Sequence, residues 1–322
     1  MPYAIRMHKT GGPEVLTFEE VPQQNPKAGE VRIKQTAIGL NFIDTYHRSG
    51  LYPLQLPLTL GTEAAGVVEA VGRGVKTLKE GDRVAYCGVT GAYAESRVIA
   101  ADRLVKLPRW IDDKTAAAMM LKGMTAEYLI RRTYRVKKGE TVVFHAAAGG
   151  VGLIACQWLK QLGVNVIGTV GSEEKAKLAK RHGCRHPVLY KKQSLVEAVK
   201  KITKGKGVPV VYDSVGASTF EQSLDCLAPL GLFVSFGNAS GPVPPFNPAI
   251  LAQKGSLYFT RPTLQTYAAS REDLEKSARA LFSAVKKGVK IRIDQTFPLK
   301  DTKKAHRALE SRKTTGSTIL IP

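Results

Sequence analysis

The second half of the chain alternates short apolar runs with amphipathic segments. The apolar runs are rich in β-branched side chains, which is typical of strands buried on both faces of a parallel sheet. The runs predicted as strands are residues 141–144, 164–170, 187–190, 208–212, 232–236 and 256–259. The segments predicted as helices, with apolar residues at helical spacing, are residues 151–162, 173–182, 194–203 and 218–227. Regular alternation of strand and helix predicts an α/β fold with a doubly wound parallel sheet.

The first third of the chain has a different pattern. From Tyr3 to about Lys106, short alternating strands such as residues 31–35 and 66–71 are separated by Gly and Pro turns. We therefore predict a β-rich unit in this region. A helical pattern over residues 116–132 then leads into the alternating region.

The tail after Glu272 predicts a long helix, a strand, a helix over residues 301–311 and a final strand at 318–322. That last strand could return to the β-rich unit. The chain has 322 residues, which exceeds the usual limit for one hydrophobic core, so two domains are expected. The boundaries predicted are a discontinuous β-rich domain, residues 1–123 and 262–322, and an inserted α/β domain, residues 124–261.

The turn between the first strand and first helix of the alternating region carries a candidate binding site. Residues 145–152 have the sequence His-Ala-Ala-Ala-Gly-Gly-Val-Gly. A strand, a glycine-rich turn and a helix in this order suit a dinucleotide pyrophosphate. The helix amino end offers unpaired N–H donors and partial positive charge, and the glycines let phosphate and backbone approach closely. The alternative is a plain tight turn, but the strand before it and the helix after it favour nucleotide binding.

The end of the second strand indicates which nicotinamide cofactor binds. NAD-binding folds usually place an Asp or Glu there for the ribose 2′-OH. Here Gly171 and Ser172 occupy the site, and the first carboxylate is Glu173. Lys175 follows, and Tyr190 ends the next strand. A hydroxyl, a cation and a phenol suit a 2′-phosphate, so NADPH is favoured over NADH.

The charge of the chain leaves two interpretations open. Lysine and arginine number 48 against 27 acids, giving a net charge of +21. Such a field attracts polyanions, and NADPH is itself a small polyanion. The lysines occur in short groups on polar helix faces and turns, which favours a solvated cationic surface. A nucleic-acid-binding role is the alternative, although no motif such as an aromatic RNP run accompanies it.

Cysteine usage and hydropathy point to an intracellular protein. The four cysteines are scattered without a close pair, so neither disulfides nor a cysteine-rich zinc lobe is expected. No apolar run approaches the roughly 20 residues of a membrane span. The first residues lack a signal-peptide core, and we expect a cytoplasmic location without membrane association.

Several motifs carry a resemblance to a known family. They run through most of the chain, at residues 11–16, 39–46, 48–53, 60–66, 145–152, 212–216 and 235–238. On these motifs the chain resembles the zinc-free quinone oxidoreductases of the medium-chain dehydrogenase/reductase superfamily, the group that includes zeta-crystallin. The similarity is closest to the bacterial NADPH:quinone oxidoreductases.

The resemblance implies a GroES-like catalytic domain, an inserted Rossmann domain, a cleft between them and a homodimer. It implies a nicotinamide pocket, a pyrophosphate site and a 2′-phosphate site. The nicotinamide pocket maps onto Asn41, Phe42, Asp44 and Tyr46, with Tyr52 at the cleft mouth and Thr125 at the domain junction. The phosphate contacts map onto Ala148, Gly149, Gly150, Val151, Ser172, Lys175, Tyr190 and Arg312. The rest of the cofactor groove maps onto Ser214, Gly216, Phe236, Asn238, Thr260 and Arg261.

The positions that bind zinc in metal-dependent relatives differ here. Those relatives have Cys at the equivalent of Asn41 and His at the equivalent of Thr62. Catalytic zinc takes about three protein ligands, and Glu63 alone cannot hold the ion. We therefore expect no metal.

Without a Lewis acid, a quinone or other conjugated carbonyl is a more suitable acceptor than a simple ketone. We expect an NADPH:quinone oxidoreductase in which Asn41 orients the nicotinamide or the acceptor carbonyl. Tyr46 and Tyr52 are expected to stack on the acceptor or hydrogen-bond to it, and simple packing is their alternative. His47, beside Tyr46, is interpreted as a surface or packing residue. Other open alternatives are an enal, enone or enoyl-thioester reductase, and either hydride or single-electron transfer.

Overall fold

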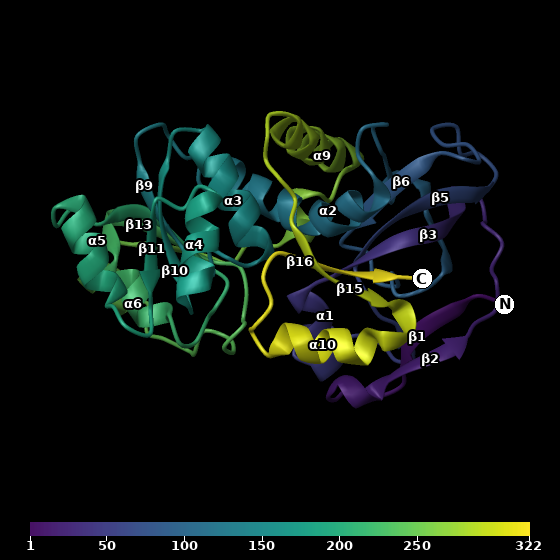
Figure 1. Ribbon diagram of the computed structural model, residues 1–322, viewed down its shortest axis with the longest axis horizontal. Helices are drawn as coiled ribbons and strands as arrows, with labels where there is room; N and C mark the ends of the chain where they lie inside the picture. The colour runs from purple at the N-terminus through teal and green to yellow at the C-terminus, as the bar shows by residue number, and fades with distance from the viewer. The chain divides into compact units, whose positions relative to one another are not determined.

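The computed structural model describes residues 1–322 and divides into two compact units. Unit 1 consists of Met1–Met124, Ala268–Arg279 and Ile291–Pro322, and unit 2 consists of Thr125–Tyr267 and Ala280–Lys290. Figure 1 follows the chain from the purple amino terminus, through the teal and green elements of unit 2, to the yellow carboxy-terminal segment of unit 1.

Unit 1 is built on a seven-stranded sheet with the order β15-β16-β3-β5-β6-β8, in which β7 also pairs with β3. Its strands are β3 (Glu30–Leu40), β5 (Glu63–Val71), β6 (Arg83–Cys87), β7 (Ser96–Ala100), β8 (Val105–Lys106), β15 (Ile293–Pro298) and β16 (Ser317–Ile321). A three-stranded sheet contains β1 (Tyr3–Met7), β2 (Leu16–Glu20) and β4 (Leu58–Thr59). The helices are α1 (Phe42–Ser49), α10 (Thr302–Glu310), and the parts of α2 (Asp113–Tyr128) and α9 (Arg271–Lys286) that fall within unit 1.

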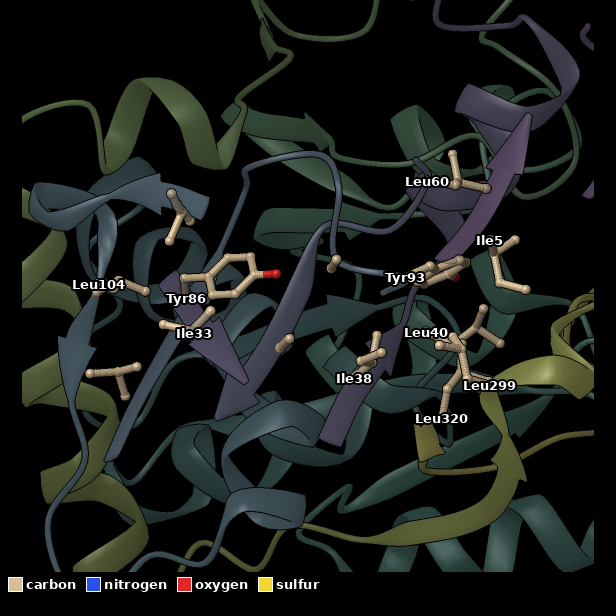
Figure 2. Packing of buried hydrophobic residues seen from close by; sticks show 14 of the residues in the cluster. Ile5, Ile33, Ile38, Leu40, Leu60, Tyr86, Tyr93, Leu104, Leu299 and Leu320 are labelled. Carbon is tan, nitrogen blue, oxygen red and sulfur yellow. The ribbon is translucent and has the colours of Figure 1, made fainter. Parts of the chain in front are cut away.

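The carboxy-terminal strand is part of the amino-terminal sheet. β16 runs antiparallel to β3, with Thr318 opposite Leu40 and Leu320 opposite Ile38. The predicted strand at 318–322 therefore forms and joins the β-rich unit. Figure 2 shows Leu320 and Leu299 from the end of the chain beside Leu40 of β3, within one apolar cluster. This packing fixes the end of β3, from which helix α1 begins.

Unit 2 is a six-stranded parallel sheet with the order β11-β10-β9-β12-β13-β14. The strands are β9 (Thr141–Phe144), β10 (Asn165–Val170), β11 (His186–Leu189), β12 (Val208–Asp213), β13 (Leu227–Ser235) and β14 (Tyr258–Thr260). The helices between them include α3 (Gly150–Gln161), α4 (Glu173–Arg181), α5 (Leu195–Thr203) and α6 (Phe220–Asp225). This strand order is that of the Rossmann fold, and it confirms the predicted doubly wound α/β architecture.

Strand β13 and helix α6 of unit 2 have bounds that differ from the sequence expectation. Strand β13 begins at Leu227, five residues before the predicted start at 232, and α6 ends at Asp225 rather than 227. Pro229 and Gly231 lie inside β13, and residues of these types argue against a strand when the sequence is considered alone. The register of β12 against β13 shifts in the same place, between Val208 and Val210. The irregular pairing accommodates residues that a regular strand excludes.

The helix predicted over residues 116–132 also differs in the structure. The α-helical part is α2, which ends at Tyr128, and Leu129–Thr133 continues as a π-helical turn. Two short helices, α7 (Ala249–Gln253) and α8 (Leu264–Tyr267), were not predicted. No helix in the structure combines the length and the apolar character that crossing a membrane requires.

Candidate active site

In unit 2, the loops that follow the parallel strands carry most of the residues predicted to bind the cofactor. The carboxyl ends of parallel strands lie at one edge of a sheet, so these loops share that edge. The predicted residues in these loops, in the first turns of α3 and α4, or at the end of β14 are Ala148, Gly149, Gly150, Val151, Gly171, Ser172, Lys175, Tyr190, Ser214, Gly216, Phe236, Asn238, Thr260 and Arg261. Thr125 belongs to the same unit but lies in α2, where it is buried. Residues scattered over more than 100 positions are thus brought to one side of the sheet.

Two glycines with different roles shape the turn between β9 and α3. A Cβ on Gly152 would lie 2.4 Å from the carbonyl oxygen of Ala146, so a side chain there collides with the turn. Gly149 is the N-cap of α3, and a Cβ there would meet only the same carbonyl, at 3.2 Å. The space beside Gly149 is therefore open. Because the N–H groups of the first helical turn lack acceptors within the helix, the turn can receive an anion.

A buried histidine connects this turn to a neighbouring strand and a neighbouring helix. His145 Nδ1 lies 3.1 Å from Oγ1 of Thr169 in β10, and Nε2 lies 2.9 Å from Oγ of Ser223 in α6. The backbone N–H of Ala146 donates to the same Thr169 hydroxyl at 3.2 Å. Burial lowers the pKa of His145, although the nearby Asp213 carboxylate acts in the opposite direction. The neutral ring thus links the glycine turn to β10 and α6.

Asp213 stabilises the loop that follows β12 at the same edge of the sheet. It is fully buried at the end of β12, and its Oδ1 accepts hydrogen bonds from the backbone N–H groups of Val215 at 2.6 Å and Gly216 at 3.0 Å. Gly216 has a φ of +93°, and a Cβ there would lie 2.2 Å from the carbonyl oxygen of Gly241. The predicted cofactor residue Gly216 therefore has a conformation and a close contact that only glycine tolerates.

The residues predicted to hold a 2′-phosphate follow two neighbouring strands, β10 and β11. Ser172 is the N-cap of α4, and its Oγ accepts from the Lys175 backbone N–H at 3.3 Å. The Tyr190 hydroxyl lies over Gly171, because a Cβ on Gly171 would be 3.0 Å from that oxygen. Lys175 is partly exposed, and its partial burial lowers its pKa. A hydroxyl, a phenol and a lysine thus come from the segments that follow the neighbouring strands β10 and β11.

The acids near this cluster are engaged elsewhere. Glu173 forms an ion pair with Lys192 at 3.2 Å. A hydrogen bond from Ser172 lowers the pKa of the exposed Glu174 carboxyl. Neither acid stands at the end of β10, where a carboxylate for a ribose 2′-OH belongs.

The remaining predicted groove residues lie at the ends of β12, β13 and β14. The Phe236 ring packs against Phe144 with centroids 5.7 Å apart. Arg261 Nη1 donates to the carbonyl oxygen of Ser235 at 3.0 Å, which joins the ends of β13 and β14. The carbonyl oxygen of Ser214 accepts from the N–H of Ala239. Asn238 is buried, whereas Thr260 is partly exposed.

In unit 1, the predicted nicotinamide and acceptor residues lie on α1 and just beyond it. Phe42 and Tyr46, one helical turn apart, have ring centroids 6.2 Å apart. Tyr52 packs its edge against Tyr46 with centroids 5.2 Å apart. His47 is buried beside Tyr52, and burial lowers its pKa. The aromatic pair Tyr46 and Tyr52 therefore forms a continuous surface, and His47 packs against it.

Asp44 of α1 is the acceptor at the centre of a buried network. Its carboxylate accepts from the backbone N–H of Asn41 at 2.9 Å, from Thr62 Oγ1 at 2.9 Å and from Tyr93 Oη at 2.8 Å. Burial raises the pKa of Asp44 to about 6, and these hydrogen bonds only partly oppose it. Asp44 is fully buried, so it fixes the start of α1 through its neighbours.

The network extends from Asp44 to the surface through residues that sequence reasoning missed. The Arg48 guanidinium, which only donates, lies 2.9 Å from Nδ1 of His306, so Nδ1 accepts and Nε2 carries the proton. That Nε2–H faces the Tyr93 hydroxyl at 3.2 Å. Burial and the Arg48 charge lower the pKa of His306 to about 3. Arg48 also pairs with Glu310 at the surface, which ties α10 to α1.

A second buried cluster joins Asn41 to a charged pair. Asn41 Nδ2 donates to Glu63 Oε2 at 2.9 Å, and Lys122 Nζ donates to the same oxygen at 3.3 Å. The other oxygen, Glu63 Oε1, accepts from the backbone N–H of Leu121 at 2.6 Å. Gly39 permits this approach, since a Cβ there would lie 2.3 Å from Glu63 Oε2. Lys122 was not predicted, because in the sequence it is one lysine among many on a helix.

Arg312, the remaining phosphate residue implied by resemblance, lies in unit 1 after α10 and has a left-handed φ of 57°. No three or more His, Cys, Asp or Glu side chains are grouped so that they could hold a metal ion. The amide of Asn41 donates to Glu63, and the hydroxyl of Thr62 donates to Asp44.

Comparison with known proteins gives matches over the whole chain. Two family models match, "Alcohol dehydrogenase GroES-like domain" over residues 27–109 and "Zinc-binding dehydrogenase" over residues 150–283. Quinone oxidoreductase of Pseudomonas aeruginosa is 55% identical over 99% of each chain. A 2-haloacrylate reductase of Burkholderia is 46% identical over 100% of this chain and 99% of its own. The crystal structure of Escherichia coli quinone oxidoreductase complexed with NADPH has a TM-score of 0.97 at 53% identity, over 99% of this chain and 100% of that one.

Proposed function

The chain belongs to the quinone oxidoreductases of the medium-chain dehydrogenase/reductase superfamily, and we propose that it reduces quinones with NADPH without a catalytic metal. The observation that carries this proposal is the edge of the unit 2 sheet, where a glycine turn follows β9, Lys175 lies in the first turn of α4 after β10, and Tyr190 follows β11. The balanced reaction is quinone plus NADPH plus a proton giving hydroquinone plus NADP⁺. NADPH supplies two electrons and one hydrogen, and the solvent supplies the remaining proton.

The residues of unit 2 fit this cofactor. Open space beside Gly149 and the free N–H groups of the first turn of α3 would receive the pyrophosphate. Lys175, Ser172 and Tyr190 would hold the 2′-phosphate, since a cation and hydroxyl groups are suitable partners for a dianion. His145 keeps the turn in place through Thr169 and Ser223.

In unit 1, the acceptor would be bound by residues of α1 and the segment after it. Tyr46 and Tyr52 provide an aromatic surface on which a flat quinone can stack. The amide nitrogen of Asn41 is already engaged by Glu63, so its carbonyl oxygen is the group that can orient a donor of the nicotinamide or the substrate. A phenol with a pKa near 10 can protonate a reduced oxygen, and so can water.

A second candidate function is the reduction of another activated alkene. The specific observation in its favour is the 46% identity to a 2-haloacrylate reductase over the whole chain. The cofactor loops of unit 2 serve either reaction, because both reductions need the same electron donor. The residues that bind the acceptor determine which of the two substrates is reduced.

Steady-state assays test the proposal. NADPH oxidation, followed at 340 nm, is measured with 1,4-benzoquinone, with 2-chloroacrylate and with an α,β-unsaturated aldehyde. The proposal expects kcat/KM for the quinone to exceed the other two. Turnover of 2-chloroacrylate with no turnover of any quinone would replace the first function by the second.

We further propose that residues 1–123 and 262–322 serve as the catalytic domain, residues 124–261 as the NADPH-binding domain, and that the protein is a cytoplasmic homodimer. The cytoplasmic location is supported by four buried cysteines, none in a disulfide. The homodimer is supported by β14, an edge strand on which Tyr258 is 60% exposed, and by the adjacent Leu230, which is 65% exposed. Sedimentation of the wild type and of Tyr258→Lys measures this assembly.

A further inference from the structure

We propose that the Lys122 ammonium supplies positive charge to the acceptor, in the role that a metal ion has in zinc-dependent relatives. This inference rests on the proposed quinone reduction. It concerns a residue outside the predicted site, and it starts from the cluster formed by Asn41, Glu63 and Lys122.

The cluster is a charged pair withdrawn from water. Glu63 is 0% exposed and Lys122 is 6% exposed. Removing two charges from water is costly, and such a pair is weak evidence for stability by itself. Apolar residues of similar size would serve packing at least as well. A buried lysine at this place therefore needs a role that depends on its charge.

The position of the ammonium links it to the acceptor residues. Lys122 Nζ and Asn41 Nδ2 both donate to the same oxygen, Glu63 Oε2, so the cation lies one carboxylate away from Asn41, a residue of the expected nicotinamide pocket. Asn41 and Thr62 occupy the positions where zinc relatives have two of their ligands. The charge of Lys122 therefore lies next to a site from which the metal ligands are missing.

The ammonium also keeps unused donor capacity. An ammonium has three N–H donors, and Glu63 Oε2 is the one hydrogen-bond partner of Lys122 in the structure. The carboxylate, in contrast, is occupied by Asn41, Lys122 and the backbone of Leu121. The Lys122 ammonium therefore has N–H donors available for a negative charge that develops on the acceptor, whereas the Glu63 carboxylate does not.

The chemistry of quinone reduction gives this charge a function. As the quinone takes up two electrons, negative charge develops on its oxygen before a proton from water arrives. A fixed cation in a site of low dielectric constant stabilises that charge in the transition state more than in the ground state. The benefit is largest for quinones that are hard to reduce, because more charge has developed on their oxygen in the transition state.

The first test is a quinone series with Lys122→Met. We measure kcat per NADPH-binding protein, with bound NADPH counted by fluorescence titration, for quinones that span a range of reduction potentials. Removal of one preorganised donor typically costs a factor of about 100 to 1,000 in kcat. We expect a loss of about 100-fold for the quinones of lowest potential, a loss of a few-fold for the highest, and an unchanged Kd for NADPH. An equal loss across the series would overturn the proposal.

The second test separates catalysis from neutralisation of Glu63. Glu63→Gln leaves the Lys122 ammonium buried without its counter-ion. It is compared with the double variant Glu63→Gln/Lys122→Met, in which both charges are removed. If Lys122 only neutralises Glu63, the double variant is at least as active as Glu63→Gln. The proposal expects the opposite, a further loss of about 10-fold or more with a Tm no lower than that of Glu63→Gln.

Lys114→Met is the matched control, since Lys114 lies on the same helix but is exposed. It should leave every parameter unchanged. A wild-type protein that turns over no quinone would defeat the proposed function itself. A wild type that is active, with the double variant equal to Glu63→Gln, would defeat only the role of Lys122.

Discussion

The two regions that carry the predicted site are constructed differently. In unit 2, the predicted cofactor residues follow successive strands at one sheet edge, and backbone groups and glycines define their geometry. In unit 1, the residues predicted to bind the acceptor lie beside buried charged and polar side chains from α1, β5, α2 and α10. The first region therefore depends on space for an anion, and the second on the placement of charge. Substitutions that add a methyl group should damage the first region, and substitutions that change a charge should damage the second.

The largest expected effect is the loss of NADPH binding in Gly149→Val. The valine side chain fills the open space beside the N-cap of α3 while meeting few atoms of the protein itself. We expect the Kd for NADPH to rise more than 100-fold, with little change in Tm, since losing several phosphate hydrogen bonds costs on the order of 3 kcal/mol or more. Fluorescence titration measures the Kd.

Gly152→Ala gives the contrasting control. Its Cβ would approach the Ala146 carbonyl oxygen to 2.4 Å, so this variant should lower Tm as well as affinity. Undiminished NADPH binding by Gly149→Val would contradict the role given to the turn.

The next effect concerns the pH dependence of stability in unit 1. The pKa of Asp44 is raised by burial from 3.8 to about 6, so the folded state holds a proton that the unfolded state has released. The stabilisation is complete below pH 4 and is lost as the pH rises through 6. A shift of about two pKa units corresponds to about 3 kcal/mol. Urea unfolding from pH 4 to 7 measures the effect. We expect the free energy of unfolding of the wild type to fall by about this amount relative to that of Asp44→Asn.

Asp112→Asn is the control of opposite sign. Burial acts to raise the pKa of Asp112, but hydrogen bonds from Thr115 outweigh it and lower the pKa. Its contribution to stability is therefore present above pH 4 and is lost as the pH falls. If the free energies of unfolding of the wild type and of Asp44→Asn change in parallel from pH 4 to 7, the pKa of Asp44 is not raised in the folded state.

A smaller effect is expected for Lys175→Glu. The new carboxylate repels a 2′-phosphate but not a 2′-OH, so KM for NADPH should rise about 10- to 100-fold while KM for NADH changes little. Lys177→Glu, on the exposed face of the same helix, should change neither. An equal rise for both cofactors would remove Lys175 from the phosphate site.

The contrast between the regions also explains how much the sequence could predict. The glycine turn and the residues around Lys175 were predictable, because loops after parallel strands meet at one edge whatever their distance in sequence. The start of β13 was not, since Pro229 and Gly231 argue against the strand that the sheet nevertheless forms there. Local preference yields in that place to pairing with β12 and β14.

The buried partners in unit 1 were beyond sequence reasoning. Glu63 and Lys122 are 59 residues apart, and Tyr93 and His306 are 213 residues apart. Neither pair has a periodicity or spacing that marks it, and 48 lysines and arginines offer many equivalent candidates. Only the folded sheet, in which β16 returns beside β3, brings α10 and α1 together. Asn41 and Asp44 were identified by resemblance, but their partners required the structure.

The central claim is that the protein is an NADPH:quinone oxidoreductase that needs no metal ion. Its most direct measurement is NADPH oxidation at 340 nm with 1,4-benzoquinone, before and after dialysis against EDTA, with metal content determined by mass spectrometry. The account predicts the same kcat for the metal-free and the untreated protein. Activity that disappears on dialysis and returns with added zinc would contradict it.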